Sequence, residues 1–341
     1  MSPTRTSDQP PVRTLSDLAK IAGVSAGTVS RALAGNSLVN DATRDRIVAL
    51  ARAHGFRPNQ MASSLRRQKT DVIGIVIPLG HDQRQQISDA FFMTLLGHLA
   101  DALTERGYDL MLRRVLPDRD EDWLDRFIGS GMIDGVIVIG QSDQLERIEE
   151  AAANFRPMVV WGDHAQGQQH CVVGTDNRLG GKLAAERLIA GGARHIYFLG
   201  DVSAVEFAAR FAGATDAAEG HGVAITPLTN HLSADRLEAE VAGNLDRPLG
   251  PGDAIFAASD MLAVAALARL RTRGIDVPGT VKVIGFDDLP FAAQTSPPLT
   301  TIRQDIRAGA FAMVDRLMRR LDGADAPSIV LPPTLVERGT A

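Results

Sequence analysis

Two kinds of hydrophobic pattern divide the chain. Near the N-terminus, apolar positions recur at helical spacing, so that Leu15, Leu18, Ala19 and Ala22 share one face of a predicted helix. From about residue 71 onward, continuous apolar runs alternate with segments of helical spacing. Such alternation is typical of parallel sheets whose strands are buried on both faces. We therefore expect a small all-α head followed by an α/β body.

Local signals predict where the helices of the head begin and end. Thr14 followed by Asp17 is a variant of the capping box, and Gly23 can adopt the left-handed conformation that ends a helix. Ser25 is a good N-cap for a second helix, and a third is expected over about 41–54. Two short helices joined by a three-residue turn that contains glycine predict a helix-turn-helix.

A helix-turn-helix places the N-terminal residues of its second helix at the base edges of the DNA major groove. Ser25, Thr28 and Ser30 offer hydroxyl groups to phosphates or bases, and Arg31 can bind a guanine edge or a phosphate through its fork of donors. Thr14, at the start of the first helix, is a further candidate for a contact with DNA. A helical bundle with solvated basic side chains is the alternative that this pattern leaves open.

Charge is distributed unevenly between the two parts. Residues 1–70 contain eleven Lys and Arg against four acids, a net charge of +7, whereas the rest of the chain carries −12 and the whole chain −5. A basic head on an acidic body indicates that only the head meets a polyanion such as DNA.

Residues 1–13 are polar with three prolines, so we expect a disordered tail without the apolar region of a signal peptide.

Composition excludes several classes of protein. No apolar run approaches the roughly 18 residues of a membrane span. Cys171 is the only cysteine, which excludes an intrachain disulfide and a multi-cysteine metal site. We therefore expect a cytoplasmic protein with no membrane partner, no metal and no cofactor.

The body contains enough strand and helix signals for two lobes. Six apolar runs predict strands: Val72–Ile77, Gly135–Ile139, Met158–Trp161, Ile196–Leu199, Ala254–Ala258 and Val281–Phe286. A last strand-like segment is Leu335–Glu337, and helical spacing is found over 91–106, 178–190, 206–220 and 261–273. About 270 residues is large for one sheet domain, so we expect two lobes with a ligand cleft between them, beyond the carboxyl ends of the strands.

Several segments resemble the LacI/GalR family of transcriptional regulators. In the head these are Thr14–Leu33 (TLSDLAKIAGVSAGTVSRAL), Gly55–Asn59 (GFRPN) and Ala62–Leu65 (ASSL). In the body they are Gly174–Asn177 (GTDN), Ala258–Asp260 (ASD), Ile284–Asp288 (IGFDD) and Leu299–Asp305 (LTTIRQD). The resemblance runs from Thr14 to the C-terminus.

The resemblance implies a domain plan. The helix-turn-helix would span 14–58, a hinge helix and linker 59–70, and an effector-binding and dimerisation domain 71–341. The body would have the fold of periplasmic sugar-binding proteins. Its N-terminal lobe would comprise about 71–173 and 303–332, and its C-terminal lobe about 174–302 and 333–341.

The hinge, 59–67 (NQMASSLRR), is too short to be a stable helix alone. The resemblance implies that paired hinge helices fold in the DNA minor groove, where Leu65 wedges into a base step beside contacts from Asn59 and Ala62. A linker helix with Leu65 packed on a neighbour is the alternative.

The head departs from the family at Ala26 and Gly27, where base-reading side chains are common. Ala26 offers only a methyl group to the bases, and Gly27 offers no side chain.

The resemblance also implies a ligand site made of six side chains: Phe91, Phe92, Trp161, Arg210, Ser259 and Asp287. The Arg210 fork can donate paired hydrogen bonds to adjacent hydroxyls, and an ionised Asp287 can accept from them. Trp161 could stack on a pyranose ring. Core packing is the alternative for the aromatic residues, and capping or a surface ion pair for the charged ones.

No catalytic motif was found. Gly181-Lys182 lacks the Ser or Thr of a phosphate loop, and Asp287 and Asp288, as neighbours in an extended chain, should point in opposite directions. We therefore expect a repressor, not an enzyme, that binds a pseudo-palindromic double-stranded DNA operator as a homodimer and responds to a mono- or disaccharide. A purine-type co-repressor response, and a soluble sugar-binding or sugar-processing protein, remain as alternatives.

Overall fold

The computed structural model describes residues 12–56, 69–78, 86–116, 122–141, 144–164, 167–233 and 235–341. The chain forms two compact units, 1–70 and 71–341. Of the predicted tail, residues 1–11 lie outside the described residues. Most of the predicted hinge lies outside them as well, including Asn59, Ala62 and Leu65.

Three helices make up the head, as the sequence predicts: α1 (Leu15–Ala22), α2 (Ala26–Leu33) and α3 (Asp41–Ala53). The capping box is confirmed, because Thr14 and Asp17 each bind the other's backbone N–H. Gly23 ends α1 with φ of 65°, and the Ser25 hydroxyl accepts a hydrogen bond from the backbone N–H of Thr28. The turn between α1 and α2 is therefore the predicted three-residue turn.

One small hydrophobic core holds the head together. Leu18, Val29 and Ile47, one from each helix, are fully buried in it. Val12 packs against this core, so residue 12 belongs to the head and not to the disordered tail that the sequence suggested.

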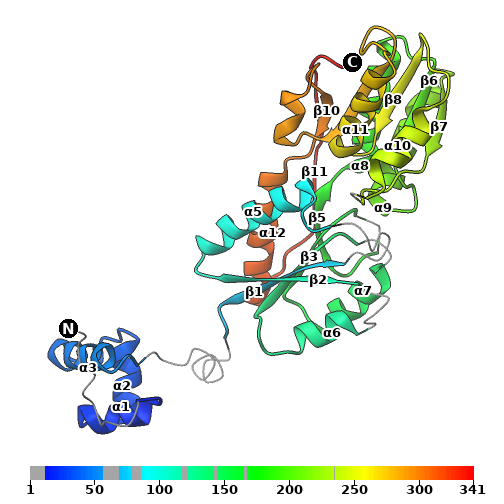
Figure 1. The fold of residues 1–341 in the computed structure, drawn as a ribbon. Coiled ribbons are helices and arrows are strands. Elements are labelled where there is room, and N and C mark those ends of the chain that lie inside the picture. The colour runs from blue at the N-terminus through cyan, green and yellow to red at the C-terminus, as the bar shows by residue number, and fades with distance from the viewer. Residues whose placement is uncertain are drawn as a thin grey trace, which may run out of the picture. The chain divides into compact units, whose positions relative to one another are not determined.

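The body contains two mainly parallel sheets, each covered by helices on both faces (Figure 1). The sheet of the N-terminal lobe has the order β11 (Ile329–Leu331), β5 (Cys171–Thr175), β4 (Met158–Trp161), β3 (Gly135–Ile139), β1 (Val72–Pro78) and β2 (Asp109–Val115). Helices α5 (Ala90–Thr104) and α12 (Ile306–Leu321) pack together on one face. Helices α6 (Trp123–Ile128) and α7 (Leu145–Asn154) supply the core of the other.

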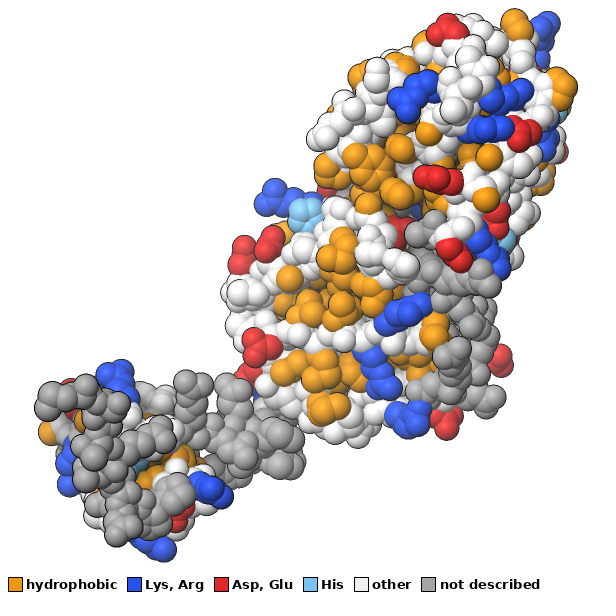
Figure 2. Space-filling model, viewed as in Figure 1, with side chains coloured by type: hydrophobic (Ala, Val, Ile, Leu, Met, Phe, Trp, Pro, Cys, Tyr) orange, Lys and Arg blue, Asp and Glu red, His pale blue; other side chains and the backbone are white. Residues whose placement is uncertain are grey.

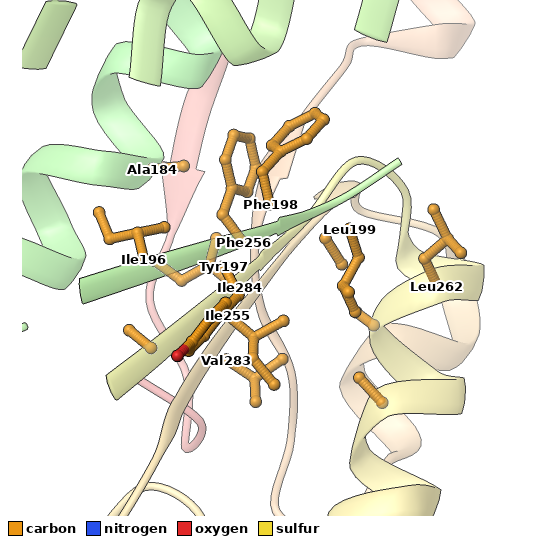
Figure 3. Packing of buried hydrophobic residues seen from close by; sticks show 14 of the residues in the cluster. Ala184, Ile196, Tyr197, Phe198, Leu199, Ile255, Phe256, Leu262, Val283 and Ile284 are labelled. Carbon is orange, nitrogen blue, oxygen red and sulfur yellow. The ribbon is translucent and has the colours of Figure 1, made fainter. Parts of the chain in front are cut away.

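The sheet of the C-terminal lobe has the order β12 (Thr334–Val336), β10 (Thr300–Arg303), β9 (Lys282–Asp287), β8 (Asp253–Ala257), β6 (His195–Leu199) and β7 (Ala224–Leu228). Only β12 is antiparallel to its neighbour. Four α-helices belong to this lobe: α8 (Asn177–Ala190), α9 (Val205–Gly220), α10 (Leu237–Leu245) and α11 (Asp260–Thr272). A short 3₁₀ helix, η2 (Pro290–Gln294), follows β9. Figure 3 shows Phe198 and Phe256 on one side of these strands and Ile255 and Val283 on the other, so both faces are buried.

The chain passes between the lobes three times: after β5, after β10, and between β11 and β12. Strand β5 continues to Thr175 within the first sheet, two residues beyond the expected boundary at 173. Among the described residues, no helix combines the length and apolar character that crossing a membrane requires.

The six strands and four helices predicted from apolar runs and helical spacing are present, each within about two residues of its expected ends. They are β1, β3, β4, β6, β8, β9, α5, α8, α9 and α11. The strand-like segment at 335 is β12. Five strands (β2, β5, β7, β10, β11) and four helices (α6, α7, α10, α12) were not predicted.

The last residues of the chain are built into the sheet of the C-terminal lobe. The Thr340 hydroxyl is fully buried, accepts a hydrogen bond from the backbone N–H of Thr300 (2.8 Å) and donates one to the carbonyl of Val283 (2.7 Å). The backbone N–H of Val283 in turn donates to the Thr340 carbonyl. This short segment therefore joins strands β9 and β10 at their starts.

We expect Thr340→Val to destabilise the body, because it keeps the shape of the side chain but leaves a buried N–H and a buried carbonyl unpaired. Such a loss costs about 1–3 kcal/mol in the free energy of unfolding, which urea unfolding followed by circular dichroism would measure. Thr272→Val is the matched control, since Thr272 is exposed on α11. Equal stability of the two variants would contradict the assigned role of Thr340.

Candidate nucleic-acid interface and ligand pocket

Helix α2 presents a polar surface opposite its buried side. Gly27 and Arg31 are exposed and lie across the helix from Val29, which is fully buried. Ser25 and Ala26 are exposed at the N-terminus of the helix, where a major-groove reader makes its base contacts. Thr28 and Ser30 are half-buried, and the Thr28 hydroxyl lies 2.9 Å from that of Ser25.

Thr14 lies away from this surface, at the N-terminus of α1. Its hydroxyl donates to the Asp17 carboxylate at 2.8 Å and accepts from the Asp17 backbone N–H at 3.1 Å. These hydrogen bonds lower the pKa of Asp17 and keep it ionised at the positive end of the helix. The contact of Thr14 with DNA remains a prediction.

The Arg31 side chain extends over Gly27. A Cβ atom added to Gly27 would lie 3.9 Å from Nη2 of Arg31 and 3.7 Å from Oγ of Ser25, both ordinary contact distances. The backbone of Gly27 is helical, without a positive φ. The glycine is therefore not required by the fold of the head.

The body contains a pocket between its two lobes. It encloses about 800 Å³ of space that is open to solvent and lies where strands β1, β3, β4 and β9 end and helices α5, α9 and α11 begin. All six side chains that the sequence suggested for the ligand site line this pocket: Phe91, Phe92, Trp161, Arg210, Ser259 and Asp287. Five of its polar, aromatic and thioether residues were not foreseen: Asp89, Glu206, Phe207, Met261 and Gln304.

The N-terminal lobe supplies an aromatic wall. The ring centroids of Phe91 and Trp161 are 5.9 Å apart, and Phe92 meets Phe91 edge to face at 6.0 Å. Trp161 is only 5% exposed, because its ring packs against Gly309 of α12, where any Cβ would come within 2.3 Å of it. The indole therefore belongs to the core and to the pocket wall at the same time.

The C-terminal lobe supplies a charged wall built around Arg210, which is 5% exposed. Its Nε donates a hydrogen bond to Oδ1 of Asn177 at 2.9 Å, and its Nη1 donates to the carbonyl of Ala258. The guanidinium carbon lies 3.7 Å from the ring centroid of Phe286, a cation–π distance. Burial lowers the pKa of Arg210, and the carboxylate of Asp287, 3.9 Å from Nη1, opposes this shift.

Two buried carboxyl groups stand beside Arg210. Burial raises the pKa of Asp287 to about 7, although Arg210 and a 2.7 Å hydrogen bond from the Gln304 amide favour its ionised form. Burial, and then the neighbouring Asp287, raise the pKa of Asp260 well above its usual range. Asp260 accepts hydrogen bonds from the Leu289 N–H (2.8 Å) and the Thr301 hydroxyl (2.6 Å).

The two carboxylates that follow one another at the end of β9 have different surroundings. Asp287 faces the pocket, whereas Asp288 accepts hydrogen bonds from Arg303 (2.7 Å) and Arg338 (2.6 Å). The two side chains thus have different partners. The backbone here is not the extended chain from which the sequence argument started, because Asp287 and Asp288 have φ of 119° and 59°. Ser259 caps α11 by accepting a hydrogen bond from the Leu262 N–H at 3.3 Å, and it lines the pocket as well.

Comparison with known proteins identifies the family. Residues 14–59 match the model of bacterial regulatory proteins of the lacI family, and residues 185–341 match that of a periplasmic binding protein-like domain. The chain is 30% identical to the HTH-type transcriptional regulator CelR of Thermobifida fusca, over 91% of this chain and 92% of that protein. This chain belongs to the lacI family. It is a DNA-binding transcriptional regulator and not an enzyme.

Two solved structures of lacI-family proteins resemble the whole chain. A lac repressor dimer bound to operator and an anti-inducer superimposes with a TM-score of 0.84, at 25% identity, over 97% of this chain and 99% of that one. A complex of the regulator CelR with cellobiose gives a TM-score of 0.69, at 28% identity, over 96% of this chain and 99% of that one.

Sequence reasoning about this lacI-family chain missed Asp260, Asn177 and Gln304 as neighbours of the pocket charges. Asn177 and Asp260 are each the first residue of a helix, and a buried strand ends two or three residues before them. This is the region in which α/β folds place ligand contacts. Gln304 follows β10, where the chain returns to the first lobe. Position relative to the strand ends was the signal that could have found them.

The Gly27→Ala variant should stabilise the head of this lacI-family protein. The added methyl fits, and alanine has about 1 kcal/mol better helix propensity than glycine, so the free energy of unfolding of the head should rise by that order. Thermal unfolding monitored at 222 nm would show it. Gly23→Ala is the control and should destabilise, because Gly23 has φ of 65°. A loss of stability in Gly27→Ala would contradict this account of α2.

The raised pKa values of Asp260 and Asp287 predict a pH-dependent stability. Between about pH 4 and 7, the folded protein keeps protons on this pair that the unfolded chain has already released. The contribution of the pair to the free energy of unfolding is therefore largest at low pH and falls as the pH rises through this range. Between pH 5 and 8, the wild type should lose at least about 1 kcal/mol more unfolding free energy than Asp260→Asn.

Urea unfolding at both pH values would measure this difference. Asp325→Asn, which removes an exposed carboxylate, is the control and should follow the wild type. If Asp260→Asn and the wild type lost the same stability between pH 5 and 8, the buried pair would have no such role.

Proposed function

We propose that this protein is a repressor that binds a pseudo-palindromic operator as a homodimer and whose affinity for DNA falls when a mono- or disaccharide occupies the pocket. The observation that carries the proposal is the composition of the two pocket walls. An aromatic wall from one lobe faces a buried Arg210–Asp287 pair from the other.

These two walls match the two kinds of surface on a sugar. The apolar C–H face of a pyranose ring stacks on aromatic side chains, and Phe91 and Trp161 provide rings at the pocket surface. Adjacent hydroxyl groups can both donate to one carboxylate and accept from one guanidinium, which suits the Asp287 and Arg210 pair. Ser259 adds a hydroxyl group that can bind a further sugar oxygen.

The relatives support a sugar and an operator as ligands. The CelR structure contains cellobiose, and the lac repressor structure contains an operator. The +7 charge of residues 1–70 suits a polyanion, and the exposed Arg31 on α2 can reach a base edge. We further propose that Leu65 and its neighbours Asn59 and Ala62 act in the minor groove, and that the protein works in the cytoplasm, where bacterial operators are.

A second copy of this chain is the proposed partner of an apolar surface on the N-terminal lobe. Figure 2 shows hydrophobic side chains gathered over the part of the body where Figure 1 places α5, β1 and β2. Met93 on α5 is 52% exposed and Leu112 on the edge strand β2 is 42% exposed. Patches of this kind mark association surfaces, and two-fold pairing would present two heads to a palindromic site.

The operator preference and the ligand can be tested together. Selection from a random duplex library should yield a palindromic site, and Arg31→Ala should bind it roughly 5- to 150-fold more weakly. Arg31→Lys is the control: it keeps the charge but not the fork, so it should lose as much affinity if Arg31 reads guanine and much less if Arg31 binds phosphate.

Cellobiose, sucrose, maltose, ribose, guanine and hypoxanthine should then be titrated into the protein–operator complex. A sugar should weaken operator binding, by the 5- to 150-fold that is typical of coupled sites. Stronger binding with a purine would replace the proposed induction with co-repression. Two results would count against the proposal: the selection yields no site, or no compound in the panel changes the affinity of the protein for the selected site.

A further inference from the structure

Arg210 is hydrogen-bonded to the other lobe through one intermediate residue. Its Nε donates to Oδ1 of Asn177, and Nδ2 of the same amide donates to Oδ1 of Asp163 at 3.1 Å. Asn177 begins α8 in the C-terminal lobe, whereas Asp163 follows β4 in the N-terminal lobe. Both ends of one buried amide are therefore used, one on the pocket arginine and the other on the opposite lobe.

The same direction of donation continues inside the N-terminal lobe. The backbone N–H of Asp163 donates to Oε1 of Gln141 at 3.1 Å, and Nε2 of Gln141 lies 3.0 Å from Nε2 of His170. Nδ1 of His170 contacts the Glu149 carboxylate. Because burial lowers the pKa of His170, its neutral form accepts from Gln141 and donates to Glu149.

Five hydrogen bonds thus run in one direction, from the cationic Arg210 to the anionic Glu149 on α7. The amides of Asn177 and Gln141 and the imidazole of His170 each accept at one atom and donate at another, so their two hydrogen bonds strengthen each other. At Asp163 the carboxylate accepts and the backbone N–H donates, so this residue joins two such stretches. Gln141, His170 and Asn177 are all buried, which protects the chain from exchange with water.

Two glycines allow the backbone of the N-terminal lobe to approach this chain. A Cβ at Gly162 would lie 2.6 Å from the amide carbon of Gln141. A Cβ at Gly174 would lie 1.8 Å from the carbonyl oxygen of Gly162. Gly162, the residue before Asp163, is therefore closely packed between Gln141 and Gly174, so the position of Asp163 depends on the position of the N-terminal lobe.

We propose that Asn177 and Asp163 are positioning residues for Arg210, and that their hydrogen bond is the link through which pocket occupancy changes how the two lobes are held together. The second half of this inference rests on the proposed function. A ligand that binds the guanidinium must share it with Asn177, so any shift of Arg210 is passed to Asp163 and the N-terminal lobe.

Amide and carboxylate exchange provides the test. Asn177→Asp places a carboxylate against Asp163 and should break the link. Asp163→Asn keeps an acceptor oxygen and should preserve it. The double variant Asn177→Asp with Asp163→Asn restores a donor–acceptor pair of reversed polarity and should rescue the link. Asn244→Asp is the matched control, because Asn244 is a partly exposed amide of the same lobe that donates to Thr229 and Asn230.

The first readout needs no ligand. In ¹⁵N NMR spectra of the full-length protein, the Nε–H of Arg210 should exchange slowly with solvent, its signal being assigned by its loss in Arg210→Lys. Exchange should accelerate at least about tenfold in Asn177→Leu, which removes the acceptor of this N–H, and in Asp163→Ala, which leaves the Asn177 amide without its second partner. It should stay near the wild-type rate in the double variant, in which position 177 keeps an acceptor oxygen. Unchanged exchange in both Asn177→Leu and Asp163→Ala would overturn the positioning role.

The second readout is the ratio of operator affinities without and with cellobiose, or with whichever sugar of the panel acts. We expect this ratio to fall about fivefold or more in Asn177→Asp and Asp163→Ala, while the double variant and Asn244→Asp keep the wild-type ratio. Equal ratios in all variants would overturn the link between the lobes. If no sugar changes operator binding of the wild type, the proposed function and the link fail together, while Arg210 exchange still decides the positioning role.

Discussion

Arg210 places a positive charge among apolar side chains of the C-terminal lobe, and the pocket is arranged around the need to match that charge. A buried guanidinium is costly unless its donors are bonded and an opposite charge is near. Here Asn177 and the Ala258 carbonyl take two donor groups, Asp287 supplies the charge, and the Phe286 ring covers one face. These partners belong to α8, to β9 and to the residue that follows β8, so the arginine is correctly placed only when three elements of the lobe are in register.

The same constraint connects the pocket to the places where the chain passes between the lobes. Asp287 accepts a hydrogen bond from Gln304, which lies where the chain leaves β10 for the N-terminal lobe. Arg210 donates one to Asn177, which lies where the chain enters the C-terminal lobe after β5. Neither charged group can change its environment without acting on a segment shared by the two lobes. A charge pair that is held in this way suits a regulator, because a ligand that binds one member alters contacts that set the lobe arrangement.

Most strands that are buried on both faces could be predicted from the sequence. Strand β5 was missed although all of its residues are buried, because its apolar run is short and ends at Gly174 and Thr175. The central strands β1, β3, β4, β6, β8 and β9 contain continuous apolar runs, whereas the edge strands β2 (DLMLRRV) and β7 (AITPL) are mostly half-buried or exposed and have shorter apolar runs. Strand β10 was missed because its buried Thr300 and Thr301 are polar. The Thr300 hydroxyl accepts a hydrogen bond from the backbone N–H of Arg338, and the Thr301 hydroxyl donates one to Asp260. The six pocket residues came from resemblance to a family. The position of Asn177 and Asp260 beyond strand ends could have marked them as candidates, but their hydrogen-bond partners are set only by the folded structure.

The central claim is that the pocket of the body and the DNA-binding head are thermodynamically coupled, and ligand affinity in two states tests it most directly. Calorimetric titration of the active sugar into the free protein and into the protein saturated with operator duplex would give both dissociation constants. The account predicts weaker binding to the operator complex, by the same factor by which the sugar weakens operator binding. Equal dissociation constants in the two states would contradict it.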